Sequence, residues 1–432
     1  MLFYSTGGQV KDVSFKEAVL QGVAPDGGLY LPQELPFFTL EQLKKLRGLS
    51  FLELSIELCK VLFKDLWTED EVTRICEGAF NFPVPFLAFP NHLHVLELFH
   101  GPSLAFKDFG ARFLAKLLCN WRQVDEEIIV LVATSGDTGS AVGLALHGLP
   151  GIHAYVLFPK GYITPSQQQQ LTTIGHNVKA VEIVGSFGEC QRLVLEALRD
   201  EELHERGRVT TGNSLNVARL FPQALYYFYA YSQLAEHGKE AIFSVPCGNF
   251  GHLISGMLAK KMGLPIAQFL AVTNINDEIP VFLKTGIFQP HEAYHTLAVS
   301  MDVGNPSNFP RLLALYDNSV EKMRQDISGF SVTDEQILAA VKQMYSAYGY
   351  LLDPHSATAY LALRDFMKNE ENPGIFFATA HPAKFQESLS SIVTQPIPIP
   401  ERLQTLFSKP QNYVSLPALY DSLSELFYSR IG

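Results

Sequence analysis

Residues 127–147 read EIIVLVATSGDTGSAVGLALH. The first eight of them, Glu127–Thr134, form an apolar run rich in β-branched residues, which is typical of a strand covered on both faces. A glycine-containing turn follows, and from about Gly139 to His147 the pattern is helical. A strand that leads directly into a helix is the first half of a β–α–β unit, so this stretch predicts a parallel sheet.

The alternation of strands and helices extends along most of the chain. Further strands are expected at Ile152–Pro159, Lys179–Val184, Ala241–Pro246, Phe269–Asn274 and Gly374–Ala380. Further helices are expected at Gly110–Leu118, Gln167–Gly175, Gly188–Arg199, Pro222–Ala235, from about Leu253 onward, and at Val332–Tyr348. This order predicts the α/β class.

The first ninety or so residues have a different character. They read as an irregular glycine-rich opening that is followed by helices at Thr39–Arg47 and Phe51–Phe63. The proline-rich run NFPVPFLAFP (Asn81–Pro90) interrupts the helical pattern. We therefore expect a boundary there.

The composition favours a compact globular protein and argues against a nucleic-acid partner. Of the 432 residues, 47% are hydrophobic and 18% are charged, which excludes a disordered chain. The 33 basic and 44 acidic residues give a net charge of −11, and no dense basic cluster is present to neutralise phosphates.

Neither a disulfide framework nor a zinc site is expected from the five cysteines. They are odd in number, far apart and without CxxC spacing, so a reducing cytosol suits them best. The histidines are scattered without metal-ligand spacing, so no catalytic metal is expected. The start lacks a signal-peptide pattern and no apolar run approaches the about 18–20 residues of a membrane span, so we expect a soluble, cytoplasmic protein with no membrane partner.

Lys107 lies in the run HGPSLAFKDFG (His100–Gly110), among aromatic and small apolar residues. Loss of hydration there would disfavour the ammonium form and leave the free amine as a nucleophile. Such a lysine suits a Schiff base with a carbonyl cofactor or substrate. The alternative is an ordinary lysine whose stem lies on apolar surface and whose head is in water.

Seven segments together resemble one known family. They are YSTGG (Tyr4–Gly8), FKEAVLQGVAPDGGLYLP (Phe15–Pro32), HGPSLAFKDFG, ATSGDTGSA (Ala133–Ala141), GNSLNVARL (Gly212–Leu220), PCGNFGH (Pro246–His252) and TAHPAKF (Thr379–Phe385). Their combination and order resemble the longer, bacterial type of the threonine synthase family, which uses pyridoxal 5'-phosphate and has the tryptophan synthase β-like fold. The match runs nearly from end to end.

The resemblance implies fold type II, with two parallel-sheet domains flanked by helices and an N-terminal segment. It implies conversion of O-phospho-L-homoserine and water to L-threonine and phosphate, through a Schiff base of the cofactor on Lys107. Two alternatives remain open. One is a related phospholyase that releases a 2-oxo acid, and the other is a non-catalytic protein on the same fold.

The resemblance assigns the cofactor phosphate to Gly248, Asn249, Phe250, Gly251 and the amide of His252. The residues themselves are compatible with this role, because glycines before a helix let backbone N–H groups approach an anion. An ordinary tight turn between a strand and a helix is the alternative. His252 departs from the Asp or Asn usual in the family, which leaves its side-chain role open.

Two other residues are matched to the cofactor ring. Thr379 corresponds to the residue facing the pyridine nitrogen, with a buried threonine bonded to backbone as the alternative. Asp137 takes the place where related lyases carry an Asn near the ring oxygen. An Asp there donates a hydrogen bond only when it is protonated.

The substrate sites also follow from the resemblance. Ser135, Gly136 and Thr138 are expected to bind the substrate carboxylate, with N-capping of the next helix as the alternative. Asn213, Ser214 and Arg219 are expected to receive the leaving phosphate, since the planar guanidinium fork of Arg suits phosphate. A capped helix with a surface arginine is the alternative.

Three segments are expected from this organisation. Residues 1–90 would form the opening and a helical segment, residues 91–235 a smaller α/β domain with Lys107 and the substrate loops, and residues 236–432 a larger domain with the phosphate cradle and the C-terminal helices. Fold type II enzymes interleave their two domains, so these limits are approximate. The expected partner is a small-molecule substrate, and the expected assembly is a monomer or homodimer.

Overall fold

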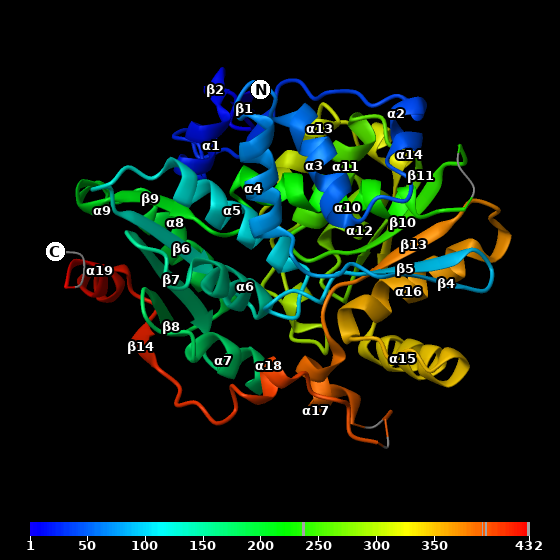
Figure 1. The fold of residues 1–432 in the computed structure, drawn as a ribbon. Helices are drawn as coiled ribbons and strands as arrows, with labels where there is room; N and C mark the ends of the chain where they lie inside the picture. The colour runs from blue at the N-terminus through cyan, green and yellow to red at the C-terminus, as the bar shows by residue number, and fades with distance from the viewer. Residues whose placement is uncertain (236–237, 391, 394, 430–432) are drawn as a thin grey trace. The chain divides into compact units, whose positions relative to one another are not determined.

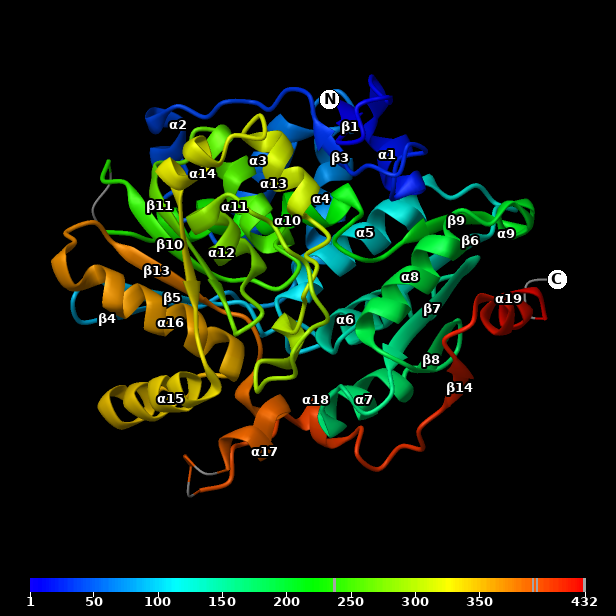
Figure 2. The ribbon, with the colours of Figure 1, turned by 180° about the vertical axis from the view of Figure 1, so that it is seen from behind.

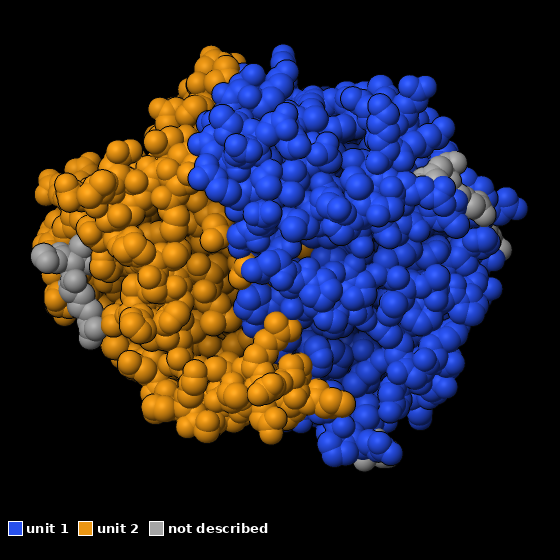
Figure 3. Space-filling view, in the orientation of Figure 1, with its two compact units in different colours: residues 1, 33–106, 220–397 blue, residues 2–32, 107–219, 398–432 orange. Residues whose placement is uncertain are grey.

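The computed structural model describes residues 1–235, 238–390, 392–393 and 395–429. Its contacts group the chain into two compact units, coloured separately in Figure 3. Unit 1 comprises residues 1, 33–106 and 220–397, and unit 2 comprises residues 2–32, 107–219 and 398–432. Each unit contains a parallel β-sheet, so the predicted α/β class is confirmed.

Unit 1 is built on a six-stranded sheet in the order β12-β11-β10-β13-β5-β4. All neighbours are parallel except the edge pair β4 and β5. The strands are β4 (Phe86–Phe89), β5 (Leu93–Glu97), β10 (Ala241–Pro246), β11 (Ile266–Thr273), β12 (Ile327–Ser331) and β13 (Gly374–Ala378). The central strands β10 and β13 are wholly buried, as their mainly apolar sequences favour, and the one polar side chain of β10, Ser244, donates to the Ala359 carbonyl.

Helices lie on both faces of this sheet, and further helices of unit 1 pack on them (Figure 1). They are α2 (Leu40–Lys45), α3 (Phe51–Leu62), α4 (Glu69–Ala79), α10 (Leu220–Ser232), α11 (Gly251–Lys261), α12 (Glu278–Thr285), α13 (Phe309–Leu315), α14 (Val320–Asp326), α15 (Asp334–Tyr348), α16 (Pro354–Phe366) and α17 (Gln386–Leu389). Short 3-10 turns lie at Val299–Met301, Met367–Asn369 and Pro382–Phe385. Figure 1 shows α10 and α11 on one side of the sheet, with α15 and α16 on the other.

Unit 2 has an all-parallel sheet in the order β14-β8-β7-β6-β9. These strands are β6 (Ile128–Ala133), β7 (Ile152–Pro159), β8 (Val178–Val184), β9 (Arg208–Thr211) and β14 (Tyr413–Pro417). A second, antiparallel sheet holds β1 (Leu2–Ser5), β2 (Val13–Ser14) and β3 (Tyr30–Pro32). The helices are α1 (Phe15–Gln21), α5 (Lys107–Trp121), α6 (Asp137–Leu146), α7 (Pro165–Thr172), α8 (Phe187–Ala197), α9 (Glu201–Arg206), α18 (Glu401–Gln404) and α19 (Tyr420–Tyr428), with a 3-10 turn at Val217–Arg219.

The alternation of side-chain direction along β6 determines which of its residues pack on each face of the sheet in unit 2. Ile129, Leu131 and Ala133 of β6 share a buried cluster with residues of α8 and α19. Figure 2 shows α8 against this face of the sheet. Alternate residues of a strand point to opposite faces, so the remaining residues of β6 face the other side, where α6 packs. The predicted doubly covered strand is therefore present.

Two sequence-based expectations about the N-terminal part are wrong. The glycine-rich opening contains the β2-β1-β3 sheet rather than irregular chain only. The proline-rich run does not mark a boundary, because β4 lies inside it and pairs with β5. These strands have only two to four residues each, so their apolar patterns are too short to predict. Their pairing partners are set by the folded chain.

The two units do not coincide with the three predicted segments. Residues 91–106 and 220–235 group with unit 1, whereas residues 398–432 group with unit 2. The cause is pairing over long sequence separations, of β5 with β13 and of β14 with β8. The predicted limits at 236 and 432 themselves lie outside the described residues.

Within the part of the chain that the structure describes, none of the helices has the length and apolarity to cross a bilayer.

Candidate active site

In unit 2, Lys107 is the first residue of α5 and its side chain is half-buried. Burial lowers the pKa of Lys107 to about 8; the nearby Arg219 charge adds to this shift, and Asp137 opposes it. A substantial fraction of the amine is therefore unprotonated near neutral pH. An ordinary solvated lysine would keep its pKa near the usual value of about 10.5.

Arg219 is a buried cation in unit 2 rather than a surface residue, with 1% of its area exposed. Its guanidinium donates to the Gly212 carbonyl, and Nη2 donates to the Lys107 carbonyl at 3.4 Å. A Cβ on Gly110 would lie 2.5 Å from Arg219 Nε, so the missing side chain lets the arginine pack on α5. The structure thus brings Lys107 and Arg219 together.

The turn between β6 and α6 carries Ser135, Gly136, Asp137 and Thr138. Gly136 has φ 144°, a conformation that suits glycine, and it is the N-cap of α6 without a side-chain capping bond. Ser135 and Thr138 are half-buried, whereas Asp137 is buried. Gly136 has no side chain with which to cap α6, so capping by Ser135 or Thr138 and binding of a substrate carboxylate both stay predictions.

Two residues that sequence reasoning missed shape this turn. Thr134 Oγ1 accepts hydrogen bonds from Gly136 N (3.0 Å) and Gly139 N (2.9 Å) and donates to the Gly136 carbonyl (2.9 Å). Gln167 Nε2 donates to Asp137 Oδ1 at 2.9 Å, while its Oε1 accepts from Thr164 N at 3.1 Å. The position of Thr134 at the end of a strand and close to a glycine could have indicated its role in the turn. The contact of Gln167 with Asp137 spans 30 positions, and no sequence pattern indicates it.

Asn213 and Ser214 follow β9 in the same unit. The Asn213 amide pairs with Ala133 through both ends, accepting from Ala133 N at 2.8 Å and donating to Ala133 O at 2.6 Å. Asn213 therefore holds the end of β6, beside the Ser135–Thr138 turn. Ser214 is half-buried in the turn that precedes Arg219. Contacts of these two residues with a phosphate stay a prediction.

In unit 1, β10 ends in the turn Cys247–Phe250, and α11 begins at Gly251. A Cβ on Gly248 would lie 3.0 Å from both Met301 Cα and the Ser300 carbonyl oxygen. Phe250 is in the left-handed region, with φ 61° and ψ 0°. The first N–H groups of a helix have no partner within it, so this turn presents donors at a helix N-terminus, as an anion requires.

The His252 side chain lies in an aromatic cluster of unit 1. Its ring stacks on Phe106 at 4.9 Å between centroids and contacts Tyr226, Tyr227 and Phe377. This packing accounts for an aromatic residue at position 252, where the family pattern has Asp or Asn. The predicted role of the His252 amide does not depend on the side chain.

Thr379 lies directly after β13 and is buried. Its N–H donates to Ser356 Oγ at 2.9 Å, and its carbonyl accepts from Phe106 N at 2.8 Å. Phe106 thus contacts both Thr379 and His252, and it is covalently bonded to Lys107. Phe106 therefore links two of the residues that are predicted to bind the cofactor within unit 1.

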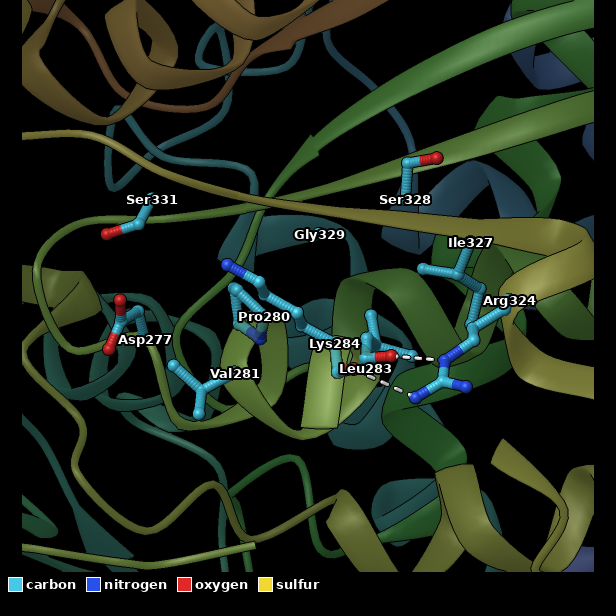
Figure 4. A pocket seen from close by; sticks show the side chains of 10 residues that line it. All are labelled: Asp277, Pro280, Val281, Leu283, Lys284, Arg324, Ile327, Ser328, Gly329 and Ser331. Atoms are coloured by element: carbon cyan, nitrogen blue, oxygen red, sulfur yellow. Dashed lines mark hydrogen bonds between the residues drawn. The ribbon is translucent and has the colours of Figure 1, made fainter. Parts of the chain in front are cut away.

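A cavity of about 580 Å³ lies elsewhere in unit 1, at the edge of the sheet beside β12 and α12. Figure 4 shows Arg324 at this cavity with its guanidinium turned to the carbonyls of Leu283 and Lys284. None of the predicted site residues lines it. Among the described residues, no group of three or more His, Cys, Asp or Glu side chains could hold a metal ion.

Comparison with known proteins identifies the chemistry. Residues 87–378 match the family described as "Pyridoxal-phosphate dependent enzyme", residues 2–80 match "Threonine synthase N terminus", and residues 356–426 match "Threonine synthase, C-terminal". The chain is 38% identical to threonine synthase of Escherichia coli over 431 residues, which cover 100% of both chains. The chain belongs to the threonine synthase family.

Solved structures of threonine synthases have the same fold. The Escherichia coli enzyme superposes with a TM-score of 0.94 at 38% identity, over 99% of this chain and 100% of that chain. The structure of the threonine synthase from Brucella melitensis with bound pyridoxal phosphate gives 0.90 at 34% identity, over 99% of each chain. A fungal L-serine ammonia-lyase from Rhizomucor miehei shares the fold alone, at 17% identity and a TM-score of 0.53, over 72% of this chain and 98% of that chain.

The family is a family of lyases that depend on pyridoxal phosphate, so the predicted fold type, enzyme class and cofactor are confirmed. The residues of this chain fit the cofactor. The turn that contains Gly248 precedes the N-terminus of α11, where backbone N–H groups suit a phosphate, and Lys107 has an amine with a lowered pKa for the cofactor's aldehyde.

Proposed function

We propose that this enzyme converts O-phospho-L-homoserine and water to L-threonine and phosphate. The observation that carries the proposal is the buried Arg219 of unit 2, which donates to the Lys107 carbonyl and whose charge helps to lower the pKa of the Lys107 amine. An amine with a lowered pKa and a fixed cation beside it suit a reaction that moves protons and releases phosphate.

Lys107 would hold the cofactor at rest and act as the base and proton carrier once the substrate amine has replaced it. Bound pyridoxal phosphate supplies an electron sink, which lets protons leave the substrate carbons beside the amine. With a pKa of about 8, Lys107 Nζ can both take and return a proton near neutral pH.

The β6–α6 turn would bind the substrate carboxylate through Ser135, Gly136 and Thr138. It lies in the same unit as Lys107, and its backbone is fixed by Thr134. A turn that is held in place before the substrate arrives loses little entropy on binding. Gln167 would orient Asp137 toward the cofactor ring oxygen, since it already binds Asp137 Oδ1.

Arg219 would receive the leaving phosphate, with Ser214 as a neutral donor. The arginine keeps its charge at every physiological pH and is held by the Gly212 carbonyl, so the positive charge is in place before phosphate leaves. Asn213 would act by holding Ala133 in position. The phosphate retained beside Arg219 would supply the base for the water that adds at Cβ.

In unit 1, Gly248, Asn249, Phe250, Gly251 and the His252 amide would bind the cofactor phosphate. Thr379 would face the pyridine nitrogen with a hydroxyl, which carries no charge. A neutral partner does not force protonation of the ring, unlike an Asp. We also propose a monomer or homodimer, and a location in the cytoplasm, for which the five free cysteines are the support.

Products measured on purified protein test the proposed reaction. We expect incubation with O-phospho-L-homoserine to release phosphate and threonine in equal amounts. Phosphate accompanied by 2-oxobutyrate would instead indicate the phospholyase alternative, in which water addition is not completed. Neither product from protein loaded with pyridoxal phosphate would contradict the proposed catalytic function.

The pH dependence of cofactor capture tests the state of Lys107. Because its pKa is lowered from the usual value of about 10.5 to about 8, the unprotonated amine increases as pH rises toward 8 and then levels off. We expect the rate at which the apoprotein captures pyridoxal phosphate to rise about tenfold per pH unit below 8 and to level off above about 9. Absorbance of the imine reports the rate. A continued rise to pH 10 would show an ordinary, solvated lysine.

A further inference from the structure

The phosphate turn of unit 1 rests on a segment that follows it by about fifty residues. Ser300 and Met301 lie against Gly248, where a Cβ would come within 3.0 Å of their backbone atoms. Further along this segment, Ser307 donates twice to Asn249 Oδ1, from its N–H at 3.1 Å and its Oγ at 2.6 Å. The conformation of the turn therefore depends on residues outside it.

Asn308 makes the central contact from this segment. Its side chain is wholly buried, and Nδ2 donates to the Asn249 carbonyl at 2.8 Å. Its Oδ1 accepts from Arg311 Nη1 at 2.7 Å. The amide of one residue thus links the backbone of the phosphate turn to a guanidinium.

Arg311 is the first residue after Pro310 and is also wholly buried, on α13. Burial lowers the pKa of Arg311 to about 9, so the guanidinium remains protonated at neutral pH. The positive charge of Arg311 is therefore connected to the turn by two hydrogen bonds, from Arg311 to Asn308 and from Asn308 to the Asn249 carbonyl. Charge in a buried setting is weakly screened, so this cation favours an anion at the turn.

We infer that Asn308 is a positioning residue that holds the Gly248–Phe250 turn in its phosphate-binding conformation, and that Arg311 fixes the orientation of Asn308. This inference rests on the proposed function, because it assigns the turn to the cofactor phosphate. Position 308 needs one donor and one acceptor on the same planar group. Asn supplies both, Asp only acceptors, and Ala neither.

The Asn308→Asp substitution separates these two contacts with little change of shape. The carboxylate keeps an acceptor for Arg311 but cannot donate to the Asn249 carbonyl, and it adds negative charge behind the turn. We expect the dissociation constant of the apoprotein for pyridoxal phosphate to rise about tenfold, which corresponds to loss of one buried hydrogen bond. Binding of pyridoxal, which has the same aldehyde but no phosphate, should change less than about twofold.

Both dissociation constants can be measured by titration of the apoprotein, followed by absorbance. Asn276→Asp is the matched control in unit 1. Asn276 is also buried, donates through Nδ2 to the Tyr294 carbonyl at 3.0 Å and accepts from Tyr294 N at 2.7 Å. It has no hydrogen bond to the phosphate turn among the described residues, so the control should leave the ratio of the two constants unchanged.

If Asn308→Asp fails to fold, Ser307→Ala provides the milder test, since it removes only the Oγ bond to Asn249. It should raise the constant for pyridoxal phosphate about threefold and leave that for pyridoxal unchanged. Equal effects on both ligands would overturn the inference, because they indicate a general loss of structure. Wild-type protein that binds neither ligand would overturn the proposed function as well.

Discussion

Lys107→Ala should lower kcat at least about 10³-fold, because the variant lacks the amine that we propose holds the cofactor and acts as the base. The fold should persist. Lys107 begins α5, and alanine is a good helix former at that place. The measurements are threonine formation under saturating substrate and the imine absorbance of the purified protein, which should be absent.

Lys116→Ala is the matched control for this variant. Lys116 lies on the same helix but is exposed, so its loss should leave turnover and imine absorbance unchanged. Thermal unfolding of both variants shows whether either is destabilised. Turnover by Lys107→Ala above about one-tenth of the wild-type rate would rule out the assigned role.

Gly248→Val should weaken binding of pyridoxal phosphate about 10- to 100-fold, as expected for overpacking by about 1–3 kcal/mol. The first added carbon would lie 3.0 Å from backbone atoms of Ser300 and Met301, which cannot rotate away as a side chain can. The two further methyl groups require the turn or that segment to shift. Equilibrium dialysis of the apoprotein measures the affinity directly.

Gly188→Ala provides the comparison for a glycine that lacks such contacts. It lies in α8, where an added Cβ would come no closer than 3.6 Å to Ser186 Oγ. We expect unchanged cofactor affinity and equal or higher thermal stability, since alanine favours a helix more than glycine. Unchanged affinity in Gly248→Val would show that the turn does not bind the phosphate.

The local architecture of both units could be predicted because its signals lie within short stretches. The strand Ala241–Pro246 and the strand Ile152–Pro159 have the predicted bounds, and α6 begins two residues before its prediction. Unbroken apolar runs require burial on both faces, and glycine turns end them. The lowered pKa of Lys107 was likewise expected from its apolar neighbours, whereas its catalytic role stays a prediction.

The supporting residues of the site could not be found in this way. Gln167 contacts Asp137 across 30 positions, and Asn308 contacts Asn249 across 59. The side-chain amide of Asn213 forms hydrogen bonds with the backbone of Ala133, 80 positions away. The sequence motif around Asn213 does not indicate this contact. Polar side chains of this kind are common on surfaces, so a sequence contains no sign that they are buried and paired.

The sequence by itself determined the α/β class, the strand–turn–helix units and the lysine that suits the cofactor. Periodicity and turn residues are local properties, so they can be read from a short stretch of sequence without knowledge of any distant contact. Tertiary structure alone decided that β5 pairs with β13, that β14 pairs with β8, and that residues 300–311 contact the Gly248–Phe250 turn. Such pairings depend on which surfaces the folded chain brings together, because parallel strands need long connections and their partners are not adjacent in sequence.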